Sequence, residues 1–316
     1  MIWQAPEYKT WLTSPGLCIC HAMTSRALDS QMVSAAGKNA AFIGRLFCLI
    51  TTILLAGCST YGPARLGEKI YRDVLFASPS GHRLRMDLYV PKTTQPVPVV
   101  MWIFGGCWRF GSKGYHVNVR DLTSAGIAVA SIQYRMSNAA VYPAQLEDCR
   151  AAAQWLRDNG ARYGIDAKRM GASGESSGGQ LAALLAATEG KSRIRAVCAL
   201  YPVTDLIELG SLYAKRSVGR NLIEKLLGGP IEQKLALAAD ASPVFHIKSS
   251  LPPFLIIHGE RDRVIPVEHS EWFFRALAEA RVEAQFIVVP DKGHWFRLNN
   301  EQFAEVSRFF QVHLAK

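Results

Sequence analysis

The feature that most constrains the fold is an alternation, from residue 70 onward, of short apolar runs with helical patterns. Continuous apolar runs are typical of strands that are buried on both faces of a sheet. Strands that alternate with helices indicate a mostly parallel sheet flanked by helices, so we predict an α/β fold. The expected buried strands lie at 97–104, 127–132, 170–173, 195–200, 254–257 and 286–289.

Two further strands, at 70–77 and 82–90, alternate polar and apolar residues and are joined by a Ser-Pro-Ser-Gly turn, which predicts a half-exposed hairpin. Residues 205–250 interrupt the alternation with helical pieces and no strand. We interpret this segment as an insertion over the carboxyl edge of the sheet, where open α/β sheets bind ligands. The helices of the main fold are expected at 143–160, 177–188, 268–280 and 302–314.

Composition excludes several classes of protein. Hydrophobic residues make up 49% and charged residues 20% of the chain, which is ordinary for a globular protein and excludes a disordered one. The net charge of +10 is scattered and lacks a cluster of basic and aromatic residues, so we predict no nucleic-acid partner. Seven cysteines in 316 residues are too few for a disulfide scaffold.

The first 57 residues have the pattern of a leader rather than of the fold. Basic residues precede the apolar stretch Leu46–Gly57, which is too short to span a bilayer comfortably but suits a secretory signal. The stretch ends in Leu-Ala-Gly-Cys, which resembles the lipobox of bacterial lipoproteins. A plain signal peptide and an uncleaved anchor helix are the alternatives. A start at Met32 would make residues 1–31 an upstream extension.

If the lipobox is used, Cys58 carries the lipid, residues 58–69 form a linker, and residues 70–316 form one catalytic domain. The expected location is the cell envelope, with the chain anchored by lipid to a bacterial membrane. In a Gram-negative cell this is the outer membrane or the periplasmic side. The sequence does not identify which membrane carries the anchor, nor the oligomeric state.

The motif Gly174-Glu175-Ser176-Ser177-Gly178 lies between an expected strand and an expected helix, as a G-x-S-x-G nucleophile elbow requires. Small residues allow a tight turn that exposes the Ser176 hydroxyl and directs the first N–H groups of the helix toward whatever it attacks. A phosphate-binding glycine loop is the alternative, but no Lys-Ser or Lys-Thr follows. The neighbouring serines, Ser173 and Ser177, lack the framing glycines.

A second glycine-containing turn, Phe104-Gly105-Gly106-Cys107-Trp108, follows the first buried strand. A reaction that passes through an oxyanion needs donors at that oxygen, and each contributes about 3–4 kcal/mol to lowering the barrier. We predict that the N–H groups of Gly106, Cys107 and Ser177 supply them. The alternative is an ordinary glycine turn.

An acid and a base follow later strands. Asp262 lies in His-Gly-Glu-Arg-Asp after the strand at 254–257, and His294 lies in Asp-Lys-Gly-His after the last strand. We predict that His294 takes the Ser176 proton and that Asp262 orients the imidazole. Asp205 and Asp291 are rival acids. A further histidine, His258, sits at a strand end, where a structural role is the alternative.

These four motifs, in this order, resemble those of the α/β-hydrolase superfamily over residues 68–316. MWIFGGCWRFGSK resembles the H-G-G-G-W loop of bacterial esterases and lipases similar to hormone-sensitive lipase, and RMGASGESSGGQLAA resembles their nucleophile elbow. HGERDRVIP and DKGHWF resemble their acid and histidine loops. Feruloyl and acetyl-xylan esterases and kynurenine formamidases are related to this family. The resemblance implies hydrolysis of small or short-chain carboxylic esters with no cofactor and no metal.

Three residues depart from the family pattern. Phe104 stands where the family has His, so side-chain bonds that order the loop are lost. Cys107 stands where many members have Gly, and it would be strained if that position needs a positive φ. Ser177 replaces an Ala, which is a mild change because only its backbone N–H is used. All three members of the expected triad are retained.

The sequence therefore predicts a serine esterase that acts through an acyl-enzyme on a small ester. An arylformamidase or a serine peptidase on the same fold is the alternative within the enzyme class. A non-catalytic binding protein of hydrolase fold is the alternative from another class, and the departures at Phe104 and Cys107 motivate it. Apolar residues of the insertion could line the substrate pocket or form the insertion's own core, and core is the expected role.

Overall fold

The computed structural model describes one of the two compact units of the chain, within Ser59–Lys316. The expected leader, the lipidation site Cys58 and nearly all of the expected linker lie outside the described residues. The described ranges are 68–114, 119–189, 193–214 and 217–315.

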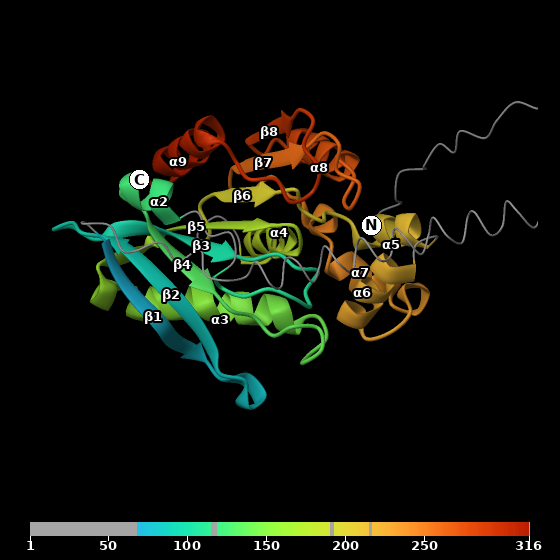
Figure 1. Ribbon diagram of the computed structural model, residues 1–316, viewed down its shortest axis with the longest axis horizontal. Coiled ribbons are helices and arrows are strands. Elements are labelled where there is room, and N and C mark those ends of the chain that lie inside the picture. The colour runs from blue at the N-terminus through green and yellow to red at the C-terminus, as the bar shows by residue number, and fades with distance from the viewer. Residues whose placement is uncertain (1–67, 115–118, 190–192, 215–216, 316) are drawn as a thin grey trace, which may run out of the picture. The chain divides into compact units, whose positions relative to one another are not determined.

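An eight-stranded sheet forms the centre of this unit (Figure 1). Its spatial order is β1-β2-β4-β3-β5-β6-β7-β8. The first two pairs, β1 with β2 and β2 with β4, are antiparallel, and all later pairs are parallel. The strands are β1 Glu68–Ala77, β2 Leu84–Pro91, β3 Val97–Ile103, β4 Ala128–Ile132, β5 Ile165–Glu175, β6 Val197–Leu200, β7 Phe254–Gly259 and β8 Ala284–Val289.

Helices cover both faces of the sheet. Helices α3, α4 and α8 pack on one face, and α2 and α9 pack on the other. The helices are α2 Val119–Ser124, α3 Ala144–Asn159, α4 Ser177–Glu189, α5 Leu206–Tyr213, α6 Ser217–Leu227, α7 Leu235–Asp240, α8 Glu268–Glu279 and α9 Asn300–Leu314. Short 3-10 helices occupy Pro79–Gly81, Gly160–Tyr163, Ile231–Gln233 and Pro243–His246. The predicted α/β fold with a mostly parallel sheet is confirmed.

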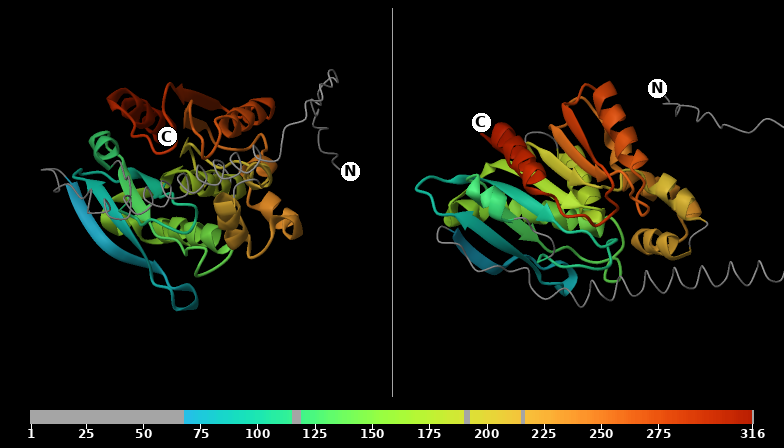
Figure 2. Two further views of the ribbon diagram at one scale, coloured as in Figure 1. Left: turned by 45° about the vertical axis from the view of Figure 1, so that its right-hand side comes forward. Right: turned by 45° about the horizontal axis from the view of Figure 1, so that its top comes forward.

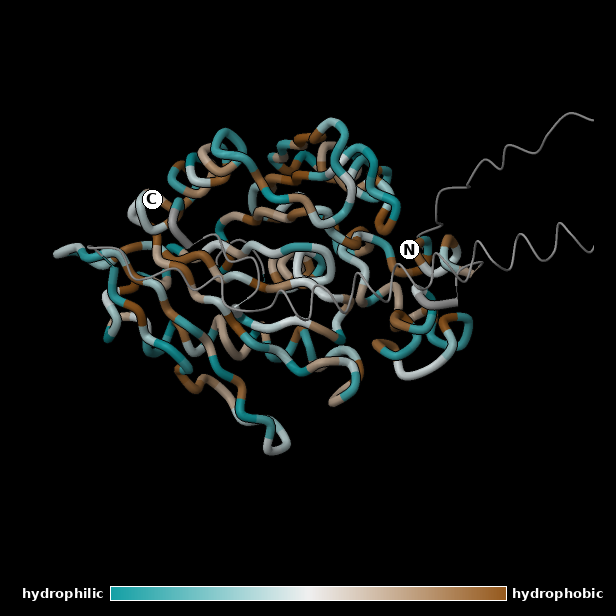
Figure 3. Tube along the Cα trace, viewed as in Figure 1, coloured by the Kyte–Doolittle hydropathy of each residue, from teal (hydrophilic) through white to brown (hydrophobic). Residues whose placement is uncertain are grey.

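The two faces carry separate hydrophobic cores, and β3 shows why a continuous apolar run builds both. Val99, Met101 and Ile103 point into the core with α3 and α4, whereas Val100 and Trp102 point into the core with α2 and α9. Successive strand residues face opposite sides of a sheet, so a strand between two helical layers must be apolar throughout. Figure 3 shows the hydrophobic residues gathered in the central strands.

The helix that follows the elbow motif is buried on all sides. Every residue of α4 from Ser177 to Ala187 is buried, and glycine, alanine and leucine make up most of this stretch. A helix that is apolar all round belongs in the interior of a protein. Burying each leucine contributes about 1.5–3 kcal/mol, so the N-terminus of α4 is held firmly in place.

Residues 205–250 form the predicted helical insertion. The three views in Figures 1 and 2 agree that α5, α6 and α7 gather at one end of the sheet, beside the carboxyl ends of the parallel strands. The N-cap of α5 is Asp205, whose side chain accepts from the N–H groups of Ile207 and Glu208. None of the helices among the described residues is both long and apolar enough to cross a membrane.

The predicted bounds fall furthest short of the observed ones at strand β5. The strand expected at 170–173 extends over Ile165–Glu175, because its first half carries polar residues that a continuous apolar run does not include. Asp166 and Arg169 form an ion pair there, and Lys168 is exposed. This first half pairs with β3 at Ile165, whereas pairing with β6 begins only at Ala172.

Candidate active site

The elbow between β5 and α4 presents Ser176 in a left-handed backbone conformation, with φ of 53°. Glycine is required on both sides for steric reasons. A Cβ on Gly178 would lie 2.1 Å from the carbonyl oxygen of Ile103, and one on Gly174 would lie 2.4 Å from that of Gly178. The glycines are therefore needed because the ends of β3 and β5 and the start of α4 meet here. Ser176 lies between the end of β5 and the start of α4.

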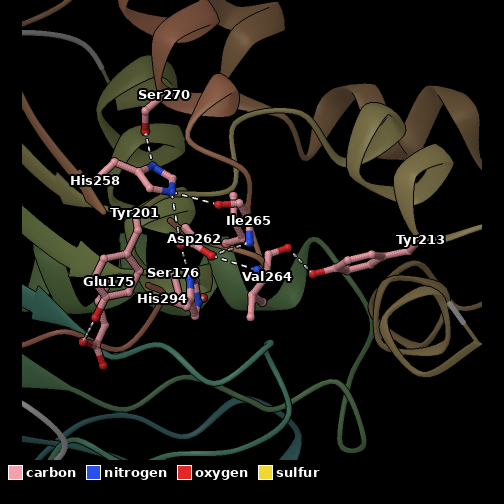
Figure 4. A network of polar contacts seen from close by, with 10 residues as sticks. All are labelled: Glu175, Ser176, Tyr201, Tyr213, His258, Asp262, Val264, Ile265, Ser270 and His294. Carbon is pink, nitrogen blue, oxygen red and sulfur yellow. Dashed lines mark hydrogen bonds and ion pairs between the residues drawn. The ribbon is translucent and has the colours of Figure 1, made fainter. Parts of the chain in front are cut away.

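Three side chains from three loops converge at this point (Figure 4). The Nε2 atom of His294 lies 3.0 Å from the Oγ of Ser176, although the two residues are 118 positions apart. The Nδ1 atom of His294 lies 2.6 Å from the Oδ2 of Asp262. All three residues are buried. The structure thus brings together the serine, histidine and aspartate that the sequence singled out.

The hydrogen bonds of Asp262 determine the tautomer of His294. An ionised carboxylate only accepts, so Nδ1 of His294 carries the hydrogen and Nε2 faces Ser176 with its lone pair. The other oxygen of Asp262 accepts from the N–H groups of Val264 and Ile265. Burial alone would raise the pKa of Asp262, but hydrogen bonds from His258 and His294 outweigh it and hold the pKa well below its usual range.

His258 is a second histidine on the same carboxylate. Its Nε2 lies 3.1 Å from Oδ2 of Asp262 and 2.9 Å from the carbonyl oxygen of Ile265. Both partners are acceptors, so Nε2–H donates to them, and Nδ1 lies 2.7 Å from the hydroxyl oxygen of Ser270. His258 therefore holds the acid loop in place, a structural role that the sequence left open.

Tyr201 supports the imidazole from the other side. Its ring lies edge-on to that of His294, with centroids 4.7 Å apart, and its hydroxyl donates to Oε2 of Glu175 at 2.7 Å. Burial, followed by the charge of Glu175, raises the pKa of Tyr201 well above its usual value, so the hydroxyl remains a donor. Sequence reasoning missed this residue, although its place directly after the buried strand β6 was a usable signal.

The turn after β3 lies against the elbow. A Cβ on Gly105 would lie 2.8 Å from the carbonyl oxygen of Glu175 and 3.2 Å from the Cβ of Ser176. Within the part of the chain that the structure describes, the N–H groups of Gly106 and Cys107 form no hydrogen bond. Ser177 begins α4, where N–H groups have no partner within the helix. The three predicted oxyanion donors thus come from segments that meet at Ser176.

The departures at Phe104 and Cys107 have local explanations. Phe104 is fully buried and stacks on Tyr134 with ring centroids 4.5 Å apart, and the Tyr134 hydroxyl donates to the carbonyl oxygen of Phe104. These contacts hold Phe104 in place at the position where the sequence resemblance implied a His. Cys107 has φ of 55°, so the strain expected of a non-glycine residue is present. Burial raises the pKa of its thiol to about 11, which keeps it protonated.

The rival residues have other contacts. Asp205 caps α5, as described above, and Asp291 is exposed and pairs with Arg261. The Oγ of Ser177 accepts from the N–H of Trp108, and Ser173 lies within β5. None of these residues is in contact with His294 through a hydrogen bond of the described residues. Within the same part of the chain, no group of three His, Cys, Asp or Glu side chains could hold a metal ion.

The insertion contacts the acid loop and helix α4. Tyr213, from α5, donates to the carbonyl oxygen of Val264 at 2.5 Å, and Figure 4 shows it reaching the acid loop. On the other side, Gln180 of α4 donates to the carbonyl oxygen of Ala241, which directly follows α7. Sequence reasoning missed both residues: Tyr213 stands in no motif, and Gln180 lies within the elbow motif at a position to which the motif assigns no chemistry.

The central sheet, the helical layers and the Ser-His-Asp geometry define an α/β-hydrolase. A sequence model of the BD-FAE family matches residues 86–277, which is more than half of the chain. The chain therefore belongs to the BD-FAE family. The predicted resemblance to esterases of α/β-hydrolase fold is confirmed by the relatives and structures described next.

Among characterised proteins, esterase LipC of Mycobacterium tuberculosis is 32% identical over 222 residues, which cover 65% of this chain and 54% of LipC. The chain thus spans about half the length of that relative. Ethyl acetate hydrolase of Pseudomonas putida is 27% identical over 71% of this chain and 74% of its own length. A truncated carbohydrate esterase from gut microbiota is 28% identical and superposes with a TM-score of 0.71, over 81% of this chain and all of that one.

Proposed function

We propose that this protein is a serine carboxylic-ester hydrolase in which Ser176 is the nucleophile, His294 the general base and Asp262 the orienting acid. The observation that carries the proposal is the continuous relay from Ser176 Oγ to His294 Nε2, at 3.0 Å, and from His294 Nδ1 to Asp262 Oδ2, at 2.6 Å. The esterase names of the relatives support the reaction class.

In the acylation step, Ser176 Oγ attacks the ester carbonyl carbon while His294 Nε2 takes the hydroxyl proton. The carbonyl oxygen becomes an oxyanion, which the N–H groups of Gly106, Cys107 and Ser177 stabilise. The intermediate then collapses, the bond to the alcohol oxygen breaks, and His294 returns its proton to the departing alcohol. Asp262 stays ionised throughout and stabilises the imidazolium, which its lowered pKa favours.

In the deacylation step, a water molecule takes the place of the alcohol. His294 removes one proton from the water as its oxygen attacks the acyl carbon, and a second oxyanion forms in the same place. Collapse breaks the bond to Ser176 Oγ, which regains the proton from His294 and releases the carboxylic acid. The acyl group is expected to be short, since ethyl acetate hydrolase and a carbohydrate esterase are among the similar proteins.

The direct test measures hydrolysis of nitrophenyl acetate and butyrate by the full chain and by Ser176→Ala. We expect the variant to lose at least ~10³ in kcat, because removing a triad member leaves only binding and oxyanion stabilisation. Ser173→Ala is the matched control, since Ser173 is a buried serine three residues away in β5. It should retain the wild-type rate. Equal rates for wild type and Ser176→Ala would end the proposal.

The alternatives are outcomes of a second measurement. A fluorophosphonate probe labels Ser176 in any enzyme that activates it and leaves a non-catalytic binding protein unlabelled. If the residue is labelled, a panel of acetyl and feruloyl esters, formanilides and short peptides separates an esterase from an arylformamidase or a serine peptidase. We expect the fastest turnover on an ester.

We also propose that the chain is a bacterial lipoprotein of the cell envelope, anchored to a membrane through Cys58. The support is the sequence Leu-Ala-Gly-Cys at the end of a short apolar stretch. Several acyl chains together hold a protein on a membrane, whereas one does so only marginally. Mass spectrometry of the membrane-extracted chain should find a lipidated N-terminal Cys58. A free N-terminus upstream of Cys58 would contradict the anchor without affecting the esterase proposal.

A further inference from the structure

The loop that follows β3 has an unusual backbone. Three consecutive residues, Gly106, Cys107 and Trp108, have positive φ values of 116°, 55° and 57°. Residues other than glycine rarely adopt this conformation, and it persists only where surrounding contacts enforce it. Two of these residues supply N–H groups to the proposed oxyanion hole, so the contacts that enforce the conformation decide whether those donors are in place.

Trp108 receives most of those contacts, and it is only 2% exposed. Its backbone N–H donates to Ser177 Oγ at 3.3 Å, and its carbonyl oxygen accepts from the N–H of Ser137 at 2.7 Å. Its indole Nε1–H donates to Oε1 of Gln180 at 2.9 Å. The loop is thus attached to α4 at Ser177 and Gln180, which are three residues apart and share one face of the helix.

Gln180 makes a second contact at its other end. Its Nε2 donates to the carbonyl oxygen of Ala241 at 2.6 Å, and its side chain is fully buried. An indole N–H can only donate and a carbonyl oxygen can only accept, so the amide has one orientation that satisfies both partners. A flipped or absent amide would leave a buried donor and a buried acceptor without partners, which low-dielectric surroundings penalise strongly.

We propose that Gln180 is a positioning residue that holds the oxyanion loop through Trp108 and couples it to the insertion through Ala241. The inference deepens the proposed esterase function and rests on it for its kinetic consequence. Gln180 lies in the first turn of the helix that begins beside Ser176, so one side chain fixes the loop relative to the nucleophile. The insertion then acts on the transition state through this amide.

The kinetic test compares Gln180→Met with wild type in the full chain. Methionine has a similar length and no amide, so it removes both bonds and keeps the volume. We expect kcat to fall by at least ~10-fold with KM within ~2-fold, because oxyanion donors act on the transition state rather than on bound substrate. Trp108→Phe removes the indole donor, together with part of the buried ring, and should give a similar fall. The double variant should fall no further than the larger single effect.

A structural readout separates positioning from general destabilisation. In hydrogen–deuterium exchange, Gln180→Met should accelerate exchange in the loop 104–114 and in residues 235–242 together. Leu185→Ala is the matched control, because Leu185 is a fully buried residue of the same helix whose apolar side chain forms no hydrogen bond to either segment. It should destabilise the fold without the paired acceleration and without the loss of kcat.

The results distinguish the two proposals. If wild type and Ser176→Ala hydrolyse esters equally, the esterase function fails, while the exchange comparison still decides whether Gln180 couples the loop to the insertion. If Gln180→Met leaves exchange in both segments unchanged, or if folded Gln180→Met and Trp108→Phe both keep the wild-type kcat, the positioning role is overturned. A rise in KM with kcat unchanged overturns it as well, because that assigns Gln180 to substrate binding.

Discussion

Four of the eight non-glycine residues with positive φ in the described ranges lie around the proposed nucleophile. Ser176, Cys107, Trp108 and Tyr201 all have positive φ values and all lie at the site. Each non-glycine residue in this region costs about 1–2 kcal/mol relative to the right-handed conformation. The fold tolerates the cost because β5, α4 and the turn after β3 meet there. As a result, the Ser176 hydroxyl is directed toward His294.

This strain is measurable at Ser176. Relative to Ser176→Ala, Ser176→Gly should increase the free energy of unfolding by about 1 kcal/mol, because glycine adopts positive φ without penalty. Ser173 offers a matched control in the same strand, outside the positive-φ residues of the described chain. There the order should reverse, with alanine the more stable. Urea denaturation of the four variants measures both differences, and equal stability of Ser176→Gly and Ser176→Ala would show that the elbow is unstrained.

Residues in motifs could be predicted from the sequence, and residues that act through space could not. Ser176, Asp262 and His294 stand in short patterns whose chemistry and order are readable, and they do meet in the structure. Tyr201 and Gln180 act by contacts with residues that are distant in the sequence, so only the fold reveals them.

Among the structural elements, long apolar strands were predictable and strand ends were not. The second half of β5 was expected. Its first half was missed because polar residues there, including Asp166 and Arg169, which form an ion pair, interrupt the apolar run. The insertion was predicted as helical, but its contacts with the rest of the fold were not predicted. Tyr213 donates to the acid loop at Val264, and Ala241 accepts from the Gln180 amide, so the insertion contacts the acid loop and helix α4.

Helix α5 of the insertion also distinguishes Asp205, one of the two rival acids, from Asp262. Asp205 accepts from two N–H groups at the start of α5, so Asp205→Ala should lower the free energy of unfolding by about 1 kcal/mol, whereas Asp205→Asn should keep most of the cap. Both should retain kcat within a few fold. Asp262→Asn should lower kcat by ~10³-fold or more, because an amide no longer fixes the Nδ1–H tautomer of His294. A comparable loss of kcat in Asp205→Asn would reassign the acid.

For the molecule as a whole, the site depends on the complete fold. The nucleophile follows β5, the acid follows β7 and the histidine follows β8, and the two antiparallel pairs extend the other end of the sheet. Parallel strands place their carboxyl ends at one edge, so residues that are far apart in the sequence meet there. Any process that unfolds the sheet therefore also removes the site.

One buried histidine makes that global stability depend on pH. His269, in the first turn of α8, is 1% exposed, and burial, together with the nearby His258, lowers its pKa to about 4. In the unfolded chain a histidine has a pKa of about 6.5, so between these values the unfolded state binds a proton that the folded state does not. Stability is therefore fully present above about pH 6.5 and falls as the pH drops toward 4.

The expected size of this effect is about 2 kcal/mol between pH 7 and pH 5, because each unit of pKa shift corresponds to about 1.4 kcal/mol. Urea denaturation of wild type and of His269→Gln at both pH values measures it. The variant removes the titrating group, so its free energy of unfolding should change by about 2 kcal/mol less than that of wild type over this interval. His82→Gln is the matched control, since His82 is exposed in the turn between β1 and β2, and it should keep the wild-type dependence. An identical pH dependence in wild type and His269→Gln would mean that folding does not shift the pKa of His269, and the acid sensitivity would then have to come from other groups.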